Sequence, residues 1–202
     1  MILLMFAHRG EAQEFIRRKH NIPVDFYFSG VYRSDDEILL LTNGGIQLTR
    51  ERMTSICTYF GKNISRVINL GIAGSLTDQL QQNQVYAIRT IYHEPDEDAL
   101  HPSFTCADKK SKIDCVTVRE PILDNDSVKG LANIAQVVDQ ELWACAAVSK
   151  HFNLPLRAYK LISDKVRDGS SAVFIKSQAA TYSKHLFDFY KKLDLSTMKF
   201  DF

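Results

Sequence analysis

The sequence predicts an α/β fold in which helices pack against a mixed central β-sheet. Segments with the apolar pattern of strands alternate with segments of helical periodicity along most of the 202 residues. The clearest unit covers residues 135–166, where two strand-like runs flank an apolar helix that ends at Asn153-Leu154-Pro155. The length suits one domain, which we place at residues 1–202, and 45% hydrophobic residues suffice for a sizeable core.

The first half of the chain contains short apolar runs and two segments with helical spacing. The runs predict strands at residues 2–6, 24–28, 37–41 and 66–70. The spacing of apolar side chains predicts helices at residues 11–19 and 47–60. Glycines indicate turns near Gly30, at residues 43–45 and at residues 71–74.

The second half repeats this alternation around one polar region. Strands are expected at residues 85–92, 115–118, 135–138 and 157–162. A helix is expected at residues 141–152, because Leu142, Trp143, Ala146 and Ala147 follow helical spacing. Residues 93–112 are polar and show no periodicity, so they predict irregular structure.

Composition limits the partners and the compartment. A formal net charge of +1 argues against a nucleic-acid-binding or membrane-surface protein. Residues 1–7 are apolar from the start and lack the charged region of a signal peptide, so they are expected to form the first buried strand. Four cysteines without CxxC spacing indicate reduced thiols in the cytoplasm. The six histidines show no metal-ligand spacing, and we expect neither a metal nor a cofactor.

Two acidic residues stand near the ends of strands in the 135–166 unit. Glu141 lies on the same helical face as small apolar residues, and Asp164 follows a strand that is expected to be buried. In open α/β sheets the ligand crevice lies at the carboxyl ends of the strands, where dry acids can acquire shifted pKa values. A structural role fits equally well, with Asp139 or Glu141 capping the helix and Asp164 opening the next turn. These residues alone leave both interpretations open.

Two motifs carry a resemblance to a known family. Val138-Asp139-Gln140-Glu141 precedes a small-residue helix, Asn153-Leu154-Pro155 and Ile162-Ser163-Asp164. Upstream, residues 67–76 read VINLGIAGSL. In this order the motifs resemble those of the nucleoside phosphorylase/nucleosidase superfamily, and most closely its methylthioadenosine/adenosylhomocysteine nucleosidase branch. The similarity can be followed to about residue 190 and implies a three-layer α/β/α sandwich around a mixed central sheet.

The resemblance also implies roles for individual residues. Asp164 would donate a proton toward N7 of a purine, and Glu141 would hold the ribose hydroxyls. Glu11, just after the first strand, would activate the attacking water, with Glu14 as the competing candidate. The other residues that the resemblance places at the substrate are Ala73, Gly74, Ser163, Gln140, Lys160 and Phe174.

Four positions depart from the family pattern or fit it loosely. Ile72 replaces a small hydroxyl residue that helps to hold water in many members. Gln140 stands where methionine usually lies beneath the ribose, and Lys160 replaces an arginine near the catalytic acid, which keeps the charge but loses the planar fork. Phe174 matches an aromatic residue beside the 5′ substituent, although a lone phenylalanine is more often part of the core.

The implied activity is hydrolysis of the N-glycosidic bond of a purine nucleoside, of the 5′-methylthioadenosine or S-adenosylhomocysteine type. Residues 69–76 contain no Lys or Arg, whereas phosphorylases of the superfamily place an arginine beside this glycine segment, so water is the expected nucleophile. Arg9 and Arg50 remain possible phosphate ligands. The alternatives are a purine nucleoside phosphorylase and a catalytically weakened nucleoside-binding homologue. The resemblance further implies a homodimer.

Overall fold

The structure is a computed structural model that describes residues 1–19, 22–96, 99–107, 111–122, 124–166 and 172–193. Its strands are β1 (Ile2–Phe6), β2 (Ile22–Pro23), β3 (Val31–Arg33), β4 (Glu37–Leu41), β5 (Arg66–Ser75), β6 (Val85–His93), β7 (Phe104–Thr105), β8 (Ile113–Thr117), β9 (Val137–Asp139) and β10 (Leu156–Lys165). Its helices are α1 (Arg9–Arg18), α2 (Ile46–Phe60), α3 (Asn125–Ala132), α4 (Leu142–His151), α5 (Ala172–Ser177) and α6 (Ala179–Tyr190), with a 3₁₀ turn at Gly61–Asn63.

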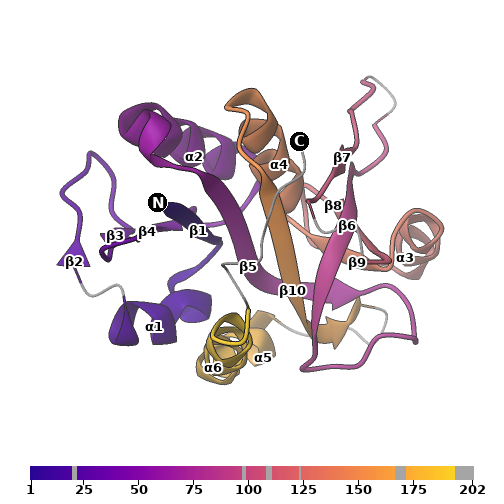
Figure 1. The fold of residues 1–202 in the computed structure, drawn as a ribbon. Helices are drawn as coiled ribbons and strands as arrows, with labels where there is room; N and C mark the ends of the chain where they lie inside the picture. Colours follow the sequence, from indigo (N-terminus) through magenta and orange to yellow (C-terminus); the bar gives the residue numbers. More distant parts are fainter. Residues whose placement is uncertain (20–21, 97–98, 108–110, 123, 167–171, 194–202) are drawn as a thin grey trace.

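The strands form one mixed sheet with helices on both faces, which confirms the predicted α/β/α sandwich. In Figure 1, α2 and α4 lie above the sheet, whereas α1, α5 and α6 lie below it. The order β2-β3-β4-β1-β5 makes an open half, in which β1 pairs in parallel with both β4 and β5. Beyond it, β5, β10, β6, β8 and β9 pair in a closed ring, because β5 contacts both β10 and β9.

Both faces of the central strands are buried, which explains why these strands are continuously apolar. Leu3 and Met5 of β1 belong to the core that α2 and α4 cover. Leu4 and Phe6 point to the opposite face and pack with residues of α1 and α6. Among the described residues, no helix combines the length and apolar character needed to cross a membrane.

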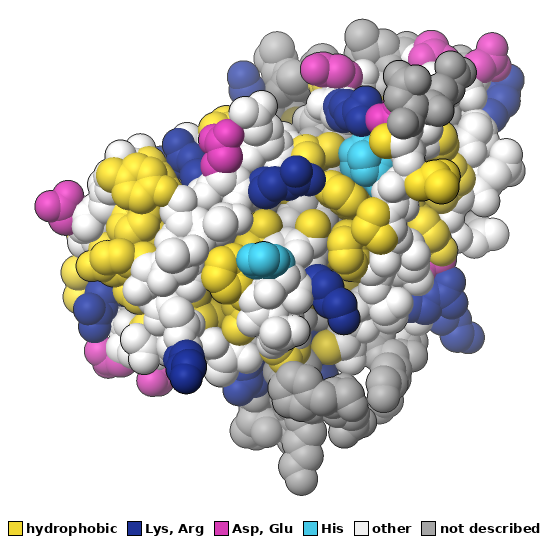
Figure 2. All heavy atoms as spheres, turned by 90° about the horizontal axis from the view of Figure 1, so that it is seen from above, with side chains coloured by type: hydrophobic (Ala, Val, Ile, Leu, Met, Phe, Trp, Pro, Cys, Tyr) yellow, Lys and Arg dark blue, Asp and Glu magenta, His cyan; other side chains and the backbone are white. Residues whose placement is uncertain are grey.

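Most predicted elements are confirmed within a few residues, but residues 24–28 do not form the predicted strand. Only Val24 continues the pairing, through its N–H to the Val31 carbonyl oxygen, 2.9 Å away. The Phe26 ring packs against Tyr27, Phe28 and Tyr59, with centroids 4.6, 4.9 and 5.2 Å away. Consecutive rings that gather in one cluster are incompatible with the alternating sides of a strand. The segment instead packs against α2 through Phe26, and its Tyr27 is 77% exposed. Figure 2 shows hydrophobic side chains on the surface above the sheet, the side on which α2 lies.

The predicted turn at residues 71–74 is also wrong, because β5 runs straight through it. Gly71 pairs with Lys160 of β10, and Gly74 pairs with both Asp164 of β10 and Val138 of β9. The helix α3 was not predicted at all, although the Asp124 carboxylate caps it through the N–H groups of Asp126 and Ser127. The glycines of β5 therefore need a different explanation from turn formation.

The long strand β5 creates an opening in the sheet. Its pairing with β1 stops at Asn69, and its pairing with β9 on that same edge begins only at Gly74. β1 and β4 end beside this gap, and because β9 is antiparallel to β5, the chain leaving β9 returns toward it. β5 and β10 continue past the gap to Ser75 and Lys165. The sheet thus opens at residues 70–73 beside the carboxyl ends of β1, β4 and β9, and ligands bind at such strand ends in open α/β sheets.

Candidate active site

Gly71 forms the floor of the opening and lets charged side chains approach β5 closely. A Cβ atom on Gly71 would lie 3.5 Å from Lys160 Nζ and 3.7 Å from each Glu11 carboxylate oxygen. A Cβ at these distances is in ordinary van der Waals contact, so only a side chain longer than alanine would meet these groups. Close approach requires glycine at Gly74, where a Cβ would lie 2.5 Å from Val166 Cγ2.

Glu11, and not Glu14, faces the opening. Its Oε2 atom accepts hydrogen bonds from the N–H groups of Ala7 (3.0 Å) and His8 (3.2 Å), and its Oε1 atom accepts one from Ile72 N–H at 3.3 Å. Glu11 is buried, whereas Glu14 makes ion pairs with two arginines on the outer side of α1. The contact with His8 shows that Glu11 also stabilises the first turn of α1, as the structural interpretation expects.

Glu141 enters the opening from the chain that follows β9. Its Oε1 atom accepts a hydrogen bond of 2.8 Å from the N–H of Gly45, and only 8% of the residue is exposed. A Cβ on Gly44 would lie 2.9 Å from the His8 ring and 3.6 Å from Glu141 Oε1, so this glycine also permits close packing. The turn at residues 43–45 was predicted, but its contact with Glu141 was not.

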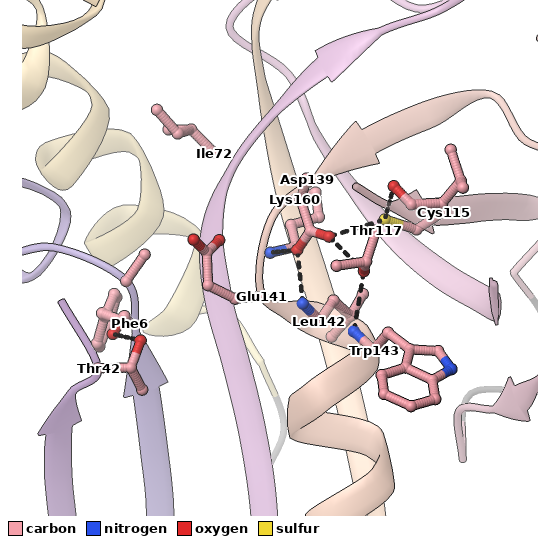
Figure 3. Close-up of polar contacts among 12 residues, drawn as sticks. Phe6, Thr42, Ile72, Cys115, Thr117, Asp139, Glu141, Leu142, Trp143 and Lys160 are labelled. Carbon is pink, nitrogen blue, oxygen red and sulfur yellow. Dashed lines mark hydrogen bonds and ion pairs between the residues drawn. The ribbon is translucent and has the colours of Figure 1, made fainter. Parts of the chain in front are cut away.

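The helix α4 is capped by Asp139 rather than by Glu141. Asp139 Oδ2 accepts the N–H of Leu142 at 3.0 Å, and Oδ1 accepts the Thr117 hydroxyl at 2.7 Å. Thr117 in turn accepts the N–H of Trp143 at 2.9 Å, which fixes the first turn of α4 (Figure 3). The Glu141 side chain makes no capping bond, so its carboxylate is available to the site.

Lys160 forms a buried ion pair with Asp139. The distance from Nζ to Asp139 Oδ2 is 2.7 Å, and the two side chains are 2% and 1% exposed. Burial alone would lower the pKa of this ammonium, but the adjacent Asp139 carboxylate raises that pKa above its usual value. Lys160 is therefore a fixed positive charge beneath the site, and Figure 3 shows its pair with Asp139 apart from the Glu141 carboxylate.

Asp164 and Ser163 lie at the end of β10, beside Gly74. The Asp164 Oδ2 atom would lie 3.8 Å from a Cβ on Gly74, and Asp164 Oδ1 accepts a hydrogen bond from the Ser163 hydroxyl. That hydroxyl is buried and also lies 3.3 Å from the Ala73 carbonyl oxygen. The structure thus gathers Asp164, Ser163, Ala73 and Gly74 at one point of the sheet.

Three positions singled out in the sequence have other contacts or exposure than the acids of the site. The Gln140 amide points to the carbonyl oxygen of Arg119, 3.4 Å away. Ile72 offers its backbone N–H to Glu11 in place of the expected side-chain hydroxyl. Phe174, at the start of α5, is 47% exposed, so the alternative that it belongs to the core is wrong.

The carboxyl group of Glu141 has a raised pKa. Burial is the main cause and the Asp139 charge the second, whereas Lys160 and the Gly45 N–H act in the opposite direction; the resulting pKa is about 7. Lys160 is paired with Asp139, and the Glu11 and Glu141 carboxylates lie at the same opening and have no cationic partner of this kind among the described residues, so full ionisation leaves an excess of negative charge. Such a site would stabilise a ligand that becomes positively charged.

Replacing Glu141 by glutamine should change how stability depends on pH. A buried carboxyl with a pKa raised to about 7 holds a proton that the unfolded chain releases near pH 4–5. Stability of the native protein should therefore fall as pH rises through this window, by an amount on the order of 3 kcal/mol. The side chain of Glu141→Gln is uncharged at every pH. The free energy of unfolding of this variant should therefore rise relative to that of the native protein between pH 5 and pH 8.

Urea unfolding at both pH values measures this difference, and Glu51→Gln on the exposed face of α2 controls for the loss of one negative charge. A gap between Glu141→Gln and the native protein that stays constant with pH would contradict the raised pKa.

The buried thiols offer no nucleophile to the site. Cys57, Cys115 and Cys145 are free thiols, and all four cysteines, including Cys106, are buried. Burial raises the pKa of the Cys57 thiol to about 12, and raises those of Cys115 and Cys145 as well. Thiolates are the reactive form, so these groups are inert packing residues.

Comparison of the sequence with protein families and with curated proteins found no match. Comparison of the structure found many solved proteins with the same fold. A 5′-methylthioadenosine/S-adenosyl homocysteine nucleosidase from Helicobacter pylori has a TM-score of 0.77 at 19% identity, over 95% of this chain and 98% of that chain. The corresponding nucleosidase from S. pneumoniae, with a transition-state inhibitor, has a TM-score of 0.78 at 16% identity, over 94% and 96%.

A second kind of nucleosidase is equally similar. Futalosine hydrolase of Helicobacter pylori has a TM-score of 0.77 at 20% identity, over 95% of this chain and 97% of that chain. Coverage is nearly complete in both directions, so the match includes every layer of the sandwich. The chain therefore has the fold of the nucleosidases in the nucleoside phosphorylase/nucleosidase superfamily.

Proposed function

We propose that the protein hydrolyses the N-glycosidic bond of a purine nucleoside. The observation that carries this proposal is the convergence of Glu11, Glu141 and Asp164 on the opening along β5. Cleavage of this bond leaves a cationic sugar and an electron-rich base, so the catalyst needs negative charge at the sugar and a proton donor at the base. The excess of acids over Lys160 supplies the first requirement.

Each acid has a distinct role in this proposal. Asp164, at the end of β10, protonates the departing base at N7. Glu141, held by the Gly45 N–H, accepts hydrogen bonds from the ribose hydroxyls. Glu11, fixed by three backbone N–H groups, accepts a proton from the attacking water.

The surroundings of Glu11 favour water over phosphate. A carboxylate 3.7 Å from the Cβ position of Gly71 would repel an anion that must lose its hydration to enter. The two arginines considered as phosphate ligands each contact an aromatic side chain: Arg9 donates to the Tyr32 hydroxyl, and the Arg50 guanidinium lies 5.6 Å from the centre of the Trp143 ring. Phosphorolysis remains the alternative, together with a weakened nucleoside-binding protein.

The similar structures and Phe174 support a nucleoside with an apolar 5′ substituent as the substrate class. An exposed aromatic side chain at the start of α5 suits an apolar 5′ substituent, as in methylthioadenosine or S-adenosylhomocysteine. Futalosine belongs in the same test, because its hydrolase is equally similar in fold. Incubation with these three nucleosides, inosine and adenosine, each with and without phosphate, identifies the substrate by release of the base.

Glu11→Gln tests whether Glu11 accepts a proton from the attacking water. We expect kcat to fall by about 10²-fold or more, because an amide cannot accept a proton from water. Affinity for the nucleoside should change much less, because the glutamine oxygen can still accept from the Ala7 and His8 N–H groups, and only the 3.3 Å bond from Ile72 N–H is lost. Glu14→Gln, one turn further along α1, is the matched control. Unchanged turnover by Glu11→Gln, or activity that requires phosphate and yields ribose 1-phosphate, would refute the proposed role of water.

A further inference from the structure

The strand β10 contains a bulge immediately before Asp164. Ile162 pairs with Ala73 and Asp164 pairs with Gly74, so Ser163 has no partner of its own on β5. A bulge of this kind bends the strand and re-aims the side chain that follows. It also leaves the Ser163 carbonyl group outside the ladder, where the peptide unit that leads into Asp164 could rotate unless other groups hold it.

The connection between β5 and β6 holds this bulge along one side. The Asn83 N–H donates to the Ile162 carbonyl oxygen at 2.8 Å, and the Ile162 N–H donates to that of Gln84 at 3.0 Å. Asn83 is left-handed, with φ of 64°, and the Gln82 amide donates to the Ser163 carbonyl oxygen at 2.7 Å. Figure 1 shows this connection passing the end of β10.

The same connection reaches β10 beyond Asp164 as well. Asp78, near the start of the connection, forms an ion pair of 3.0 Å with Lys165. Contacts therefore flank Asp164 on both sides along the chain. Because the pair is exposed, the partly buried hydrogen bond from Gln82 to Ser163 is the stronger constraint.

Tyr182 of α6 also holds the bulge. Its hydroxyl donates to the Ser163 carbonyl oxygen at 3.2 Å, so this oxygen accepts from two side chains of different elements. The Tyr182 ring is 2% exposed and belongs to the core shared by β1, β4 and α1. Burial first, and then the charge of Asp164, raise the pKa of the phenol, which agrees with a position close to that carboxylate.

We propose that Gln82 and Tyr182 are positioning residues that aim Asp164 at the leaving base by fixing the Ser163 peptide unit between them. This inference rests on the proposed function, in which Asp164 protonates the base. Proton transfer requires the acid within hydrogen-bond reach of the leaving atom, and a misplacement of about 1 Å can cost about 10²-fold in rate. Neither residue needs to touch the substrate.

The test compares Gln82→Ala, Tyr182→Phe and the double variant with Gln81→Ala, an exposed neighbour whose side chain bonds only within the connection. With a purine nucleoside, kcat should fall about 10-fold in each single variant and about 10²-fold in the double variant, with KM little changed. With 4-nitrophenyl riboside, whose leaving group departs without a proton, the same variants should match Gln81→Ala. Retained activity on this second substrate also shows that Tyr182→Phe is folded.

Including Asp164→Asn in the same assay separates the two claims. If Asp164→Asn is impaired on the nucleoside while the Gln82 and Tyr182 variants equal Gln81→Ala, the positioning inference is overturned and the proposed function stands. If Asp164→Asn itself retains full activity, the proposed function is wrong. Equal losses on both substrates would mean that Gln82 and Tyr182 support the structure generally, which also overturns the inference.

Discussion

Asp164→Asn is expected to lower kcat for a purine nucleoside by about 10²–10⁴-fold, the range for loss of a positioned general acid. The amide has nearly the same shape and can still accept the Ser163 hydroxyl, so the bulge at the end of β10 should keep its geometry. It cannot deliver a proton to the base as a carboxyl group does. KM should change little, because binding of the sugar depends on other groups.

Release of the base, followed by absorbance, measures this effect. Asp188→Asn, an exposed acid of α6 that pairs with Lys191, is the control and should have native turnover. Native turnover by Asp164→Asn would contradict its assignment as the acid.

Lys160→Met is expected to cost about 3–5 kcal/mol of unfolding free energy, because it leaves the Asp139 carboxylate buried without its counter-charge. The same carboxylate caps α4 and binds Thr117, so an unpaired charge on Asp139 would also destabilise the first turn of that helix. The double variant Asp139→Asn/Lys160→Met removes both charges and should recover much of the loss.

Urea unfolding of the single and double variants tests this account of Lys160. Lys165→Met is the matched control on the same strand, because its pair with Asp78 is largely exposed and should contribute at most about 1 kcal/mol. If Lys160→Met were as stable as Lys165→Met, the buried pair would have no structural role, and the role at the substrate predicted for Lys160 would gain support.

The fold was predictable because its signals are local and repeated. The apolar runs that become β1, β4 and β10 are buried on both faces, and such runs are recognisable without knowledge of their partners. The helix α2 was equally clear from its spacing. The turn predicted at residues 71–74 was wrong because glycine is common both in turns and where another part of the chain approaches closely. Only the pairing of Gly71 and Gly74 with β10 and β9 in the folded sheet distinguishes the two.

The acids of the site were predictable from the motifs, but their contacts were not. Sequence order places Asp139 and Glu141 two residues apart, and either could have capped α4. The distinction depends on Thr117 and Lys160, which come from β8 and β10 and approach only in the folded chain. The contacts of Gln82 and Tyr182 could not be predicted from the sequence for the same reason. Both side chains donate to the carbonyl oxygen of Ser163, which is distant from Gln82 in the sequence and lies in another element than Tyr182.

The central claim is that water attacks the sugar of a purine nucleoside in this opening. Its most direct measurement is a single turnover of methylthioadenosine, or of the best substrate found, in ¹⁸O-labelled water without phosphate. The account predicts free base and a free sugar that carries the label at its anomeric carbon as it is released. An intact nucleoside under these conditions, or base release that appears only with phosphate and gives an unlabelled sugar phosphate, would contradict it.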